Sequence, residues 1–228
     1  MELKDKVAVI TGGSKGLGRA LAEALIKEGV KVAICATNEE EVSKVAQEIG
    51  TLGIVADVRN ESDMQKLMDK TIEKYGALDI WINNAGVWMQ GAPENVDMEE
   101  VKIMFDINVI GSILGSRVAL KEMKKKNSGV IINIISKVGL YTRPNLSMYV
   151  ATKWALTGFT KTIREENNNT GIFIYGIYPG GIKTSMYTKE KPETFDSYME
   201  PRVVADKVIS NLKRENPELD LMILRENA

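Results

Sequence analysis

Short runs of β-branched and other aliphatic residues alternate along this chain with longer stretches whose apolar residues share one helical face. The short runs predict strands over residues 7–11, 31–36, 53–56, 78–83, 130–135, 172–178 and 219–224. The longer stretches predict helices over residues 16–28, 39–49, 61–75, 99–126, 147–167 and 203–213. Strands separated by helices pair in parallel, and their right-handed crossovers place helices on both faces. The alternation therefore predicts an α/β fold built on a doubly wound, parallel, seven-stranded sheet.

A chain of 228 residues fits one such Rossmann-like domain over residues 1–228, and 44% hydrophobic residues supply a substantial core. The net charge of −1 argues against nucleic acid or an anionic membrane surface as the main partner. Cys35 is the only cysteine, and its apolar surroundings in the sequence predict a buried, inert thiol. The first strand starts at Val7, which leaves no room for a leader, and no run reaches about 20 apolar residues. We therefore expect a cytoplasmic protein.

The sequence contains no histidine. This excludes histidine-based triads, histidine metal sites and an imidazole general base. We expect no metal site, and proton transfer near neutral pH must use Tyr, Lys, Asp, Glu or Cys.

Three glycines follow the first predicted strand in the pattern Gly12-x-x-x-Gly16-x-Gly18 and open the first helix. Glycines at such a turn allow a tight bend, close approach of a pyrophosphate and close packing of helix on strand. The helix N-terminus then offers free N–H groups to the phosphates. The spacing differs from Gly-x-Gly-x-x-Gly and from the P-loop, and a glycine-rich turn without a ligand is the alternative. The predicted contacts are Gly12, Ser14, Lys15, Gly16, Leu17 and Gly18.

The end of the second predicted strand bears on which dinucleotide binds. NAD sites usually place a carboxylate there, roughly 20 residues after the glycine loop, to hold the ribose 2′-OH. Here Thr37 and Asn38 follow the strand, and Lys15 adds positive charge from the glycine loop. No acid comes before Glu39. We therefore expect NADP(H) as the cofactor, with NAD(H) as the alternative, although no arginine stands there to strengthen the preference.

Tyr149 and Lys153 lie four residues apart on a predicted helix and so share one face. A free phenol has a pKa of about 10 and is a poor base at neutral pH, but a nearby ammonium favours the phenolate. Ser136 ends a predicted buried strand, where doubly wound sheets place their ligand sites, and its hydroxyl can hold a substrate oxygen. A Tyr-x-x-x-Lys pair by itself is an ordinary helix turn, so its significance depends on the other motifs.

Together these motifs make the chain similar to the short-chain dehydrogenase/reductase family, over essentially its full length. The matching elements are Thr-Gly-x-x-x-Gly-x-Gly from Thr11, Asp57, Asn83-Asn84-Ala85-Gly86, Asn108, Ser136, Tyr149-x-x-x-Lys153 and Pro179-Gly180-x-x-x-Thr184. Within the family, the chain most resembles 3-oxoacyl-(acyl carrier protein) reductases and generic carbonyl reductases.

The resemblance implies catalytic roles for four residues. Tyr149 would act as general acid in carbonyl reduction and as base in alcohol oxidation. Lys153 would lower the pKa of Tyr149 and hold the nicotinamide ribose, and Ser136 would position the carbonyl oxygen. Asn108 would hold a water that links Lys153 to solvent, although a helix cap or kink is its alternative role.

The resemblance also implies further cofactor contacts. Asp57 and Val58 would meet the adenine, although Asp57 could be a turn residue instead. The remaining contacts would be Asn84, Ala85 and Gly86 along the cofactor, and Pro179, Gly180, Ile182 and Thr184 near the nicotinamide. Asn83 is expected to stabilise the sheet.

The expected function is NADP(H)-dependent hydride transfer between the nicotinamide and a small carbonyl or secondary alcohol substrate. The alternatives are a non-catalytic NADP(H)-binding sensor and an NAD(H)-preferring alcohol dehydrogenase of the same family. Lys137 is expected either at the pocket mouth, favouring an anionic substrate, or in solvent. The segment 183–200 is expected to form a lid or a surface loop. The candidate pocket-wall residues are Trp88, Met89, Val138, Tyr141, Met148, Met186 and Tyr187.

Surplus apolar residues on two predicted helices, 99–126 and 147–167, indicate self-association. Relatives in the family commonly pair these two helices across a two-fold axis. We expect a homo-oligomer, either a dimer or a tetramer.

Overall fold

Seven parallel strands form one sheet in the order β3-β2-β1-β4-β5-β6-β7 in the computed structural model, which describes residues 1–187 and 191–225. The strands are β1 (Val7–Thr11), β2 (Lys31–Ala36), β3 (Leu52–Val55), β4 (Ile80–Asn83), β5 (Gly129–Ile134), β6 (Ile172–Pro179) and β7 (Asp220–Ile223). This agrees with the predicted doubly wound, Rossmann-like sheet.

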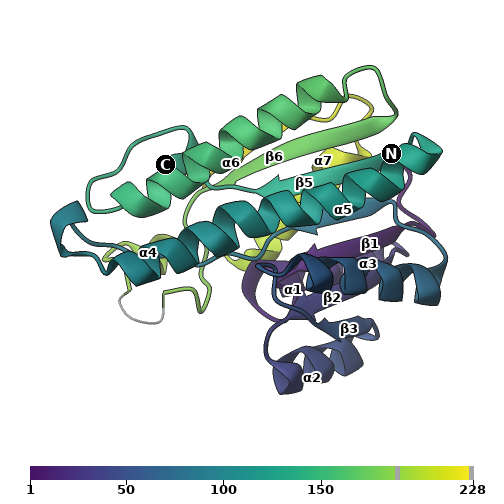
Figure 1. Ribbon diagram of the computed structural model, residues 1–228, viewed down its shortest axis with the longest axis horizontal. Coiled ribbons are helices and arrows are strands. Elements are labelled where there is room, and N and C mark those ends of the chain that lie inside the picture. The colour runs from purple at the N-terminus through teal and green to yellow at the C-terminus, as the bar shows by residue number, and fades with distance from the viewer. Residues whose placement is uncertain (188–190, 226–228) are drawn as a thin grey trace.

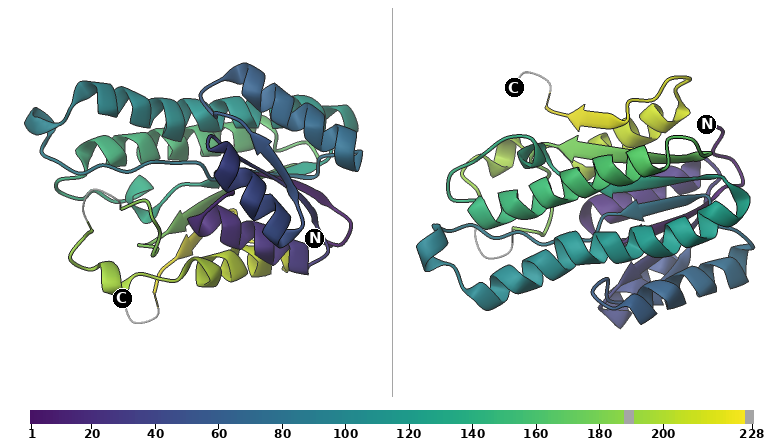
Figure 2. Two further views of the ribbon diagram at one scale, coloured as in Figure 1. Left: turned by 90° about the horizontal axis from the view of Figure 1, so that it is seen from below. Right: turned by 45° about the horizontal axis from the view of Figure 1, so that its top comes forward.

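Helices cover both faces of the sheet (Figure 1). The helices are α1 (Gly16–Lys27), α2 (Glu39–Ile49), α3 (Glu61–Tyr75), α4 (Met98–Phe105), α5 (Gly111–Lys126), α6 (Ser147–Glu166) and α7 (Pro201–Lys213). One apolar core packs α1, α2 and α7 against the sheet, and a second packs α3, α5 and α6 against the opposite face. Figure 2 shows the same division from two further sides, with α5 and α6 running side by side.

The two cores follow from the alternation of side chains along each strand. On β1, Ile10 faces the first core, whereas Val9 faces the second. Because both faces are covered, the strands are apolar throughout, as their sequences predicted. Cys35 on β2 is fully buried in the second core, and burial raises the pKa of its thiol to about 12.

The order of the strands reverses beside β1. The chain moves from β1 outward to β2 and β3, then crosses back to β4 on the other side of β1. In such folds, ligands bind in the crevice at the carboxyl ends of the strands where the direction reverses. The loops after β1 and β4 therefore meet at the expected ligand site.

The predicted helix over residues 99–126 is not a single α-helix. A π-helical turn, Asp106–Ile110, separates α4 from α5, and Asn108 lies within it. π-Turns are rare and often occur at functional sites. The periodicity of the sequence did not reveal the turn, because all three segments continue along one axis.

Among the described residues, one helix, Met98–Lys126, has the length and apolar composition to cross a membrane. Half of its most apolar window is buried inside the protein. The helix packs against α3, α6 and the strands β4 and β5, and its length and composition are equally those of a core helix.

Candidate active site

A cleft of ≈ 1180 Å³ opens at the carboxyl ends of the strands. Its lining includes all but two of the site residues expected from the sequence: Gly12, Ser14, Lys15, Gly16, Leu17, Gly18, Thr37, Asp57, Val58, Asn84, Ala85, Gly86, Ser136, Tyr149, Lys153, Pro179, Gly180, Ile182 and Thr184. The two that do not line it are Asn38 and Asn108. We call the part beside the glycine loop the glycine-loop end, and the part beside Tyr149 the tyrosine end.

The glycine loop has the geometry of a phosphate cradle. Gly12 and Gly16 have φ values of 63° and 54°, which residues with a side chain rarely adopt. A Cβ atom on Gly18 would lie 2.2 Å from the Gly12 carbonyl oxygen and 2.5 Å from the Asn84 Nδ2. Gly12 and Gly16 therefore allow the turn, and Gly18 allows close packing of α1 against the loop. Such a loop fits the pyrophosphate of a dinucleotide.

The first turn of α1 is open to a ligand. Lys15 is its N-cap residue, and no side chain caps the turn. Because the first N–H groups of a helix have no partner within the helix, they remain available to phosphate oxygens.

A second loop is fastened to the glycine loop. Asn84 donates from Nδ2 to the carbonyl oxygens of Thr11 (2.9 Å) and Gly12 (3.1 Å). The Thr11 hydroxyl accepts from the backbone N–H groups of Asn84 and Ala85, both at 3.0 Å. These bonds hold the loop after β4 beside the loop after β1, so the two line one cleft.

Near the expected 2′-phosphate site, a carboxylate already contacts Lys15 and the neighbouring Ser14. Ser14 donates to Glu41 Oε2 at 2.9 Å, and Lys15 Nζ lies 3.5 Å from Glu41 Oε1. Asn38, expected with Thr37 as a donor to the 2′-phosphate, caps α2 through its Oδ1, which accepts from the Glu41 backbone N–H at 2.8 Å. Thr37 does line the cleft. The sequence showed no acid at the strand end, but the first turn of α2 places Glu41 against the glycine loop.

Asp57 also has a charged partner within the cleft lining. Its Oδ2 lies 2.6 Å from Arg59 Nη2, and this hydrogen-bonded guanidinium holds the pKa of Asp57 below its ordinary value. Asp57 also accepts from the Arg59 backbone N–H at 3.0 Å, a turn-like contact. The expected adenine contact and the alternative turn role are thus compatible.

Tyr149, Lys153 and Ser136 meet at the tyrosine end. The Lys153 Nζ lies 5.6 Å from the centre of the Tyr149 ring and donates to the Ile134 carbonyl oxygen at 3.2 Å. Ser136 has a φ of 147°, a conformation unfavourable for a residue with a side chain, and its hydroxyl hydrogen-bonds to Tyr149. Strained backbone of this kind persists where the surroundings enforce it, commonly at active sites.

Burial shifts both titratable groups of the pair toward their neutral forms. It raises the pKa of the Tyr149 phenol, with a further rise from Tyr187, while the hydrogen bond with Ser136 opposes the shift. Burial also lowers the pKa of the Lys153 ammonium to about 8. At pH 7, Tyr149 is therefore a protonated phenol beside a lysine that is still mostly charged.

Asn108 is fully buried, and its side chain serves the loop after β4. Its Oδ1 accepts from the Val87 N–H at 2.8 Å, and its Nδ2 donates to the Val87 carbonyl oxygen at 3.0 Å. Nδ2 also lies 3.2 Å from the hydroxyl of Thr152, which precedes Lys153. The side chain thus joins the π-turn, the loop after β4 and α6.

Asn83 stabilises the sheet, as expected. It lies at the end of β4, accepts from the Trp81 indole at 2.7 Å, and donates to Asn133 and Ser116, both at 2.8 Å. All four side chains are buried, so this network is separate from the cleft.

The segment 183–200 closes on itself beside the tyrosine end. The backbone N–H of Lys183 donates to the Met199 carbonyl oxygen (2.9 Å), and the backbone N–H of Met199 donates to the Gly181 carbonyl oxygen (3.0 Å). Within it, Tyr187 packs edge-on against Trp88 of the loop after β4, with ring centres 5.0 Å apart. The segment, expected to be a lid or a surface loop, contributes residues to the cleft lining, and residues 188–190 lie outside the described part of the chain.

The candidate pocket wall was only partly predicted. Trp88, Val138, Met186 and Tyr187 line the cleft. Met89 and Met148 instead pack around Tyr149, and Tyr141 is exposed at the surface. Lys137 does line the cleft, and Arg143, which carried no sequence signal, lines it too.

The fold and the site define a nicotinamide dinucleotide-binding oxidoreductase with a tyrosine–lysine pair. A family model described as short chain dehydrogenase matches residues 6–194, and the chain belongs to this family. It is 34% identical over 192 residues to an uncharacterized oxidoreductase of Staphylococcus saprophyticus, covering 82% of each chain.

Two solved structures extend the similarity to the whole fold. A 3-ketoacyl-(acyl-carrier-protein) reductase from Brucella melitensis, complexed with NADH, has a TM-score of 0.91 and 28% identity, covering 97% of this chain and 98% of its own. An alcohol dehydrogenase from Thermococcus sibiricus, complexed with 5-hydroxy-NADP, has a TM-score of 0.85 and 28% identity, covering 96% and 95%. The first of these structures thus holds NADH and the second 5-hydroxy-NADP.

Proposed function

We propose that this oxidoreductase interconverts a carbonyl compound and a secondary alcohol, with Tyr149 as general acid and base. The observation that carries the proposal is the meeting of Ser136, Tyr149 and Lys153 at one end of a dinucleotide-shaped cleft. A sensor would need the glycine loop alone, so the complete set favours turnover over the non-catalytic alternative.

The chain's own residues divide the work as follows. The Ser136 hydroxyl holds the substrate oxygen beside Tyr149, which donates a proton to it in reduction and accepts one in oxidation. Lys153 favours the phenolate needed for oxidation through its positive charge. When bound, the nicotinamide cofactor supplies or accepts the hydride. The part of the cleft that would hold it is lined by the glycine loop except Gly13, by Asn84 to Gly86, and by Pro179 to Ile182 with Thr184.

NADP(H) remains the proposed cofactor. Thr37 and Lys15 line the cleft at the glycine-loop end, and no acid stands between Cys35 and Asn38. Glu41 opposes this choice, because its carboxylate would repel a 2′-phosphate and suits a 2′-OH. Only the rearrangement of one partly exposed carboxylate is needed to free Ser14 and Lys15, so we propose a modest preference rather than a strict one.

A ketone panel tests this proposal. We expect NADPH-dependent reduction of at least some ketones. The reaction is measured by the loss of absorbance at 340 nm as NADPH is oxidised. Tight NADPH binding without turnover of any ketone or secondary alcohol would instead support the sensor.

We also propose a homo-oligomer formed through α4, α5 and α6. Ile103, Ile110 and Trp154 are 44%, 44% and 50% exposed on these helices, an unusual exposure for large apolar side chains. A two-fold interface there would cover them and brace the helix that carries Tyr149 and Lys153. Light scattering tests this: we expect a dimer or tetramer, and a fully active 25 kDa monomer at micromolar concentration would disprove it.

A further inference from the structure

Charged side chains are arranged differently at the two ends of the cleft. At the glycine-loop end, Lys15 pairs with Glu41 and Arg59 pairs with Asp57. At the tyrosine end, Lys137 and Arg143 line the cleft, and neither forms an ion pair with any residue of the described chain. Among the described lining residues, Glu193 is the only carboxylate away from the glycine-loop end.

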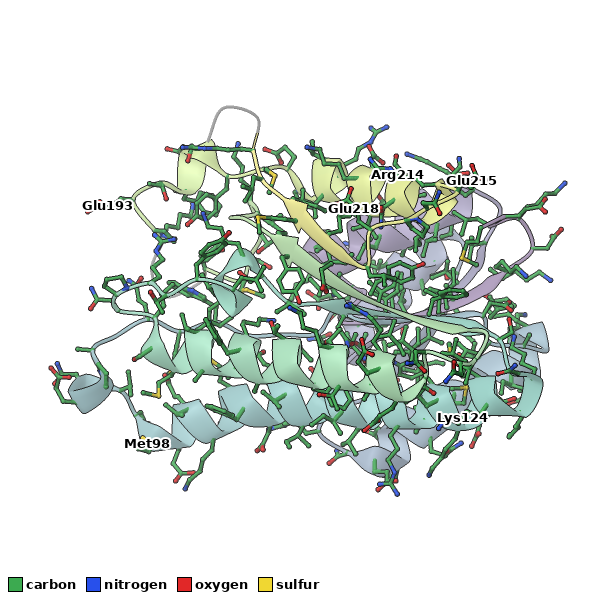
Figure 3. The ribbon with its side chains drawn as sticks, turned by 90° about the horizontal axis from the view of Figure 1, so that it is seen from above. Met98, Lys124, Glu193, Arg214, Glu215 and Glu218 are labelled. Carbon is green, nitrogen blue, oxygen red and sulfur yellow. The ribbon has the colours of Figure 1, made fainter. Side chains whose placement is uncertain are left out.

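Glu193 does not neutralise the two cations. It is exposed, and it forms no ion pair with Lys137 or Arg143. Figure 3 shows it at the end of the molecule that also carries Met98, on the segment that follows β6. Among the lining residues that the structure describes, the tyrosine end therefore keeps a surplus of positive charge.

Arg143 lies within electrostatic reach of the reaction centre. Burial raises the pKa of the Tyr187 phenol and the positive charge of Arg143 opposes that rise, while Tyr187 adds to the rise in the pKa of Tyr149; all three side chains line the cleft. Lys137 directly follows Ser136 and begins the short helical turn Lys137–Gly139, of which Ser136 is the N-cap residue. Both cations thus flank the residues proposed to hold the substrate oxygen.

The wall beside these cations is aromatic. Trp88 and Tyr187 pack edge-on at 5.0 Å, and both line the cleft. Such a wall suits an apolar substrate body, whereas Lys137 and Arg143 suit a negative charge at its end. The phosphates of a dinucleotide are served by the glycine loop at the other end, so they do not account for these cations.

We propose that the substrate carries a carboxylate in addition to its carbonyl group, and that Lys137 and Arg143 bind this carboxylate. The substrate class is therefore an oxo acid or hydroxy acid with an apolar body. This inference rests on the proposed function, because it places the substrate oxygen at Tyr149.

Matched acids and esters test the inference. The probes are 5-oxohexanoate and 4-acetylbenzoate, each compared with its methyl ester, which keeps the ketone and removes the charge. With NADPH and the intact protein, we expect kcat/KM for the acids to exceed that for the esters by about tenfold or more. We expect added salt to lower kcat/KM for the acids only, because it screens charge.

The variants Arg143→Gln and Lys137→Gln should bring the acid-to-ester ratio toward one, while Lys137→Arg should keep it. Lys124→Gln is the matched control, since Lys124 lies at the opposite end of the molecule from Glu193 (Figure 3). Calorimetry with the same probes measures binding without requiring turnover.

The outcomes separate this inference from the proposed function. Equal kcat/KM and equal binding of acids and esters would overturn the carboxylate while leaving carbonyl reduction intact, because the esters would still be reduced. A preference for acids that survives in both glutamine variants would also overturn it. Binding of the acids that depends on Arg143 and Lys137 without any reduction would support the carboxylate and count against the proposed function.

Discussion

The two ends of the cleft differ in how their charged side chains are paired and buried. At the glycine-loop end, Lys15 and Arg59 each lie beside a carboxylate on the same rim, and all four side chains are at least partly exposed. At the tyrosine end, Lys153 is 5% exposed and has no carboxylate partner among the described residues. Exposed pairs cost little and contribute little to stability, whereas a buried ammonium is expensive to fold around.

This difference indicates what each end does. Paired charges at a rim can exchange partners with a ligand at low cost, which suits selection between similar cofactors. The proposed role of Lys153 beside Tyr149 gives a reason to keep a buried, unpaired lysine despite its cost. The following variants test this difference between the two ends of the cleft.

Removing the Tyr149 hydroxyl should give the largest effect. Tyr149→Phe keeps the ring in its packed position but removes the proton donor, so kcat should fall about 10²–10⁴-fold. Cofactor binding, measured by calorimetry, should stay nearly unchanged, because the glycine-loop end is intact. A fall in kcat of less than about tenfold would show that the proton comes from another group.

Replacing the buried lysine should separate stability from activity. Burial lowers the pKa of Lys153 from 10.5 to about 8, so between pH 8 and 10.5 the unfolded chain binds more protons than the folded protein. Wild-type stability should therefore rise with pH through this window, and below it the full cost of the buried charge remains.

Lys153→Met lacks that cost. At pH 7 it should be more stable than the wild type by at most roughly 3 kcal/mol, from ~1.4 kcal/mol per pH unit, less the lost hydrogen bond to Ile134. Its activity should be lost. Urea unfolding at pH 7 and pH 10.5 measures the free energy of unfolding of the variant and the wild type. The stability advantage of the variant should shrink at the higher pH. A variant less stable at pH 7 would show that the hydrogen bond outweighs the burial of the charge.

At the glycine-loop end, a fixed carboxylate should reverse the cofactor preference. Ala36 ends β2 and lines the cleft, so Ala36→Asp places an acid where NAD sites usually carry one. NADPH affinity should fall by about tenfold or more, and NADH should become the preferred cofactor. Ala36→Asn is the uncharged control. Equal affinities of the unmodified protein for NADPH and NADH at moderate salt would contradict the proposed preference.

The smallest effect is expected from the exchangeable pair. Glu41→Gln removes the charge opposite Lys15 but keeps a group that can accept from Ser14. Binding of 2′,5′-ADP should tighten several-fold, while binding of 5′-ADP should change little, because only the first carries a 2′-phosphate. A matched substitution, Glu48→Gln, lies on the same helix away from the cleft. If Glu41→Gln left the ratio of the two affinities unchanged, Glu41 would have no part in cofactor selection.

Much of the site could be predicted because it depends on short-range patterns. Strands and helices follow from periodicity, and the glycine loop and the Tyr149–Lys153 pair each lie within one strand end or one helix turn. Ser136 follows β5, and Tyr149 lies in the first turn of α6, the next helix along the chain, so both lie at the carboxyl edge of the sheet. The boundaries of most elements agree with the prediction within one or two residues for the same reason.

The tertiary structure decided which partners these side chains have. Asn38 is the N-cap of α2 and Glu41 lies in its first turn, yet only the packing of α2 beside the glycine loop places Glu41 against Ser14. Asn108 is bound to Val87 because the π-turn brings α4 and α5 against the loop after β4, and Arg143 reaches the cleft through an irregular segment. Such contacts join residues that are distant in sequence or held in irregular backbone, so local periodicity carries no record of them. The sequence determined the fold and the chemical groups of the site; the packing of the helices and loops determined which of those groups face a ligand and which face each other.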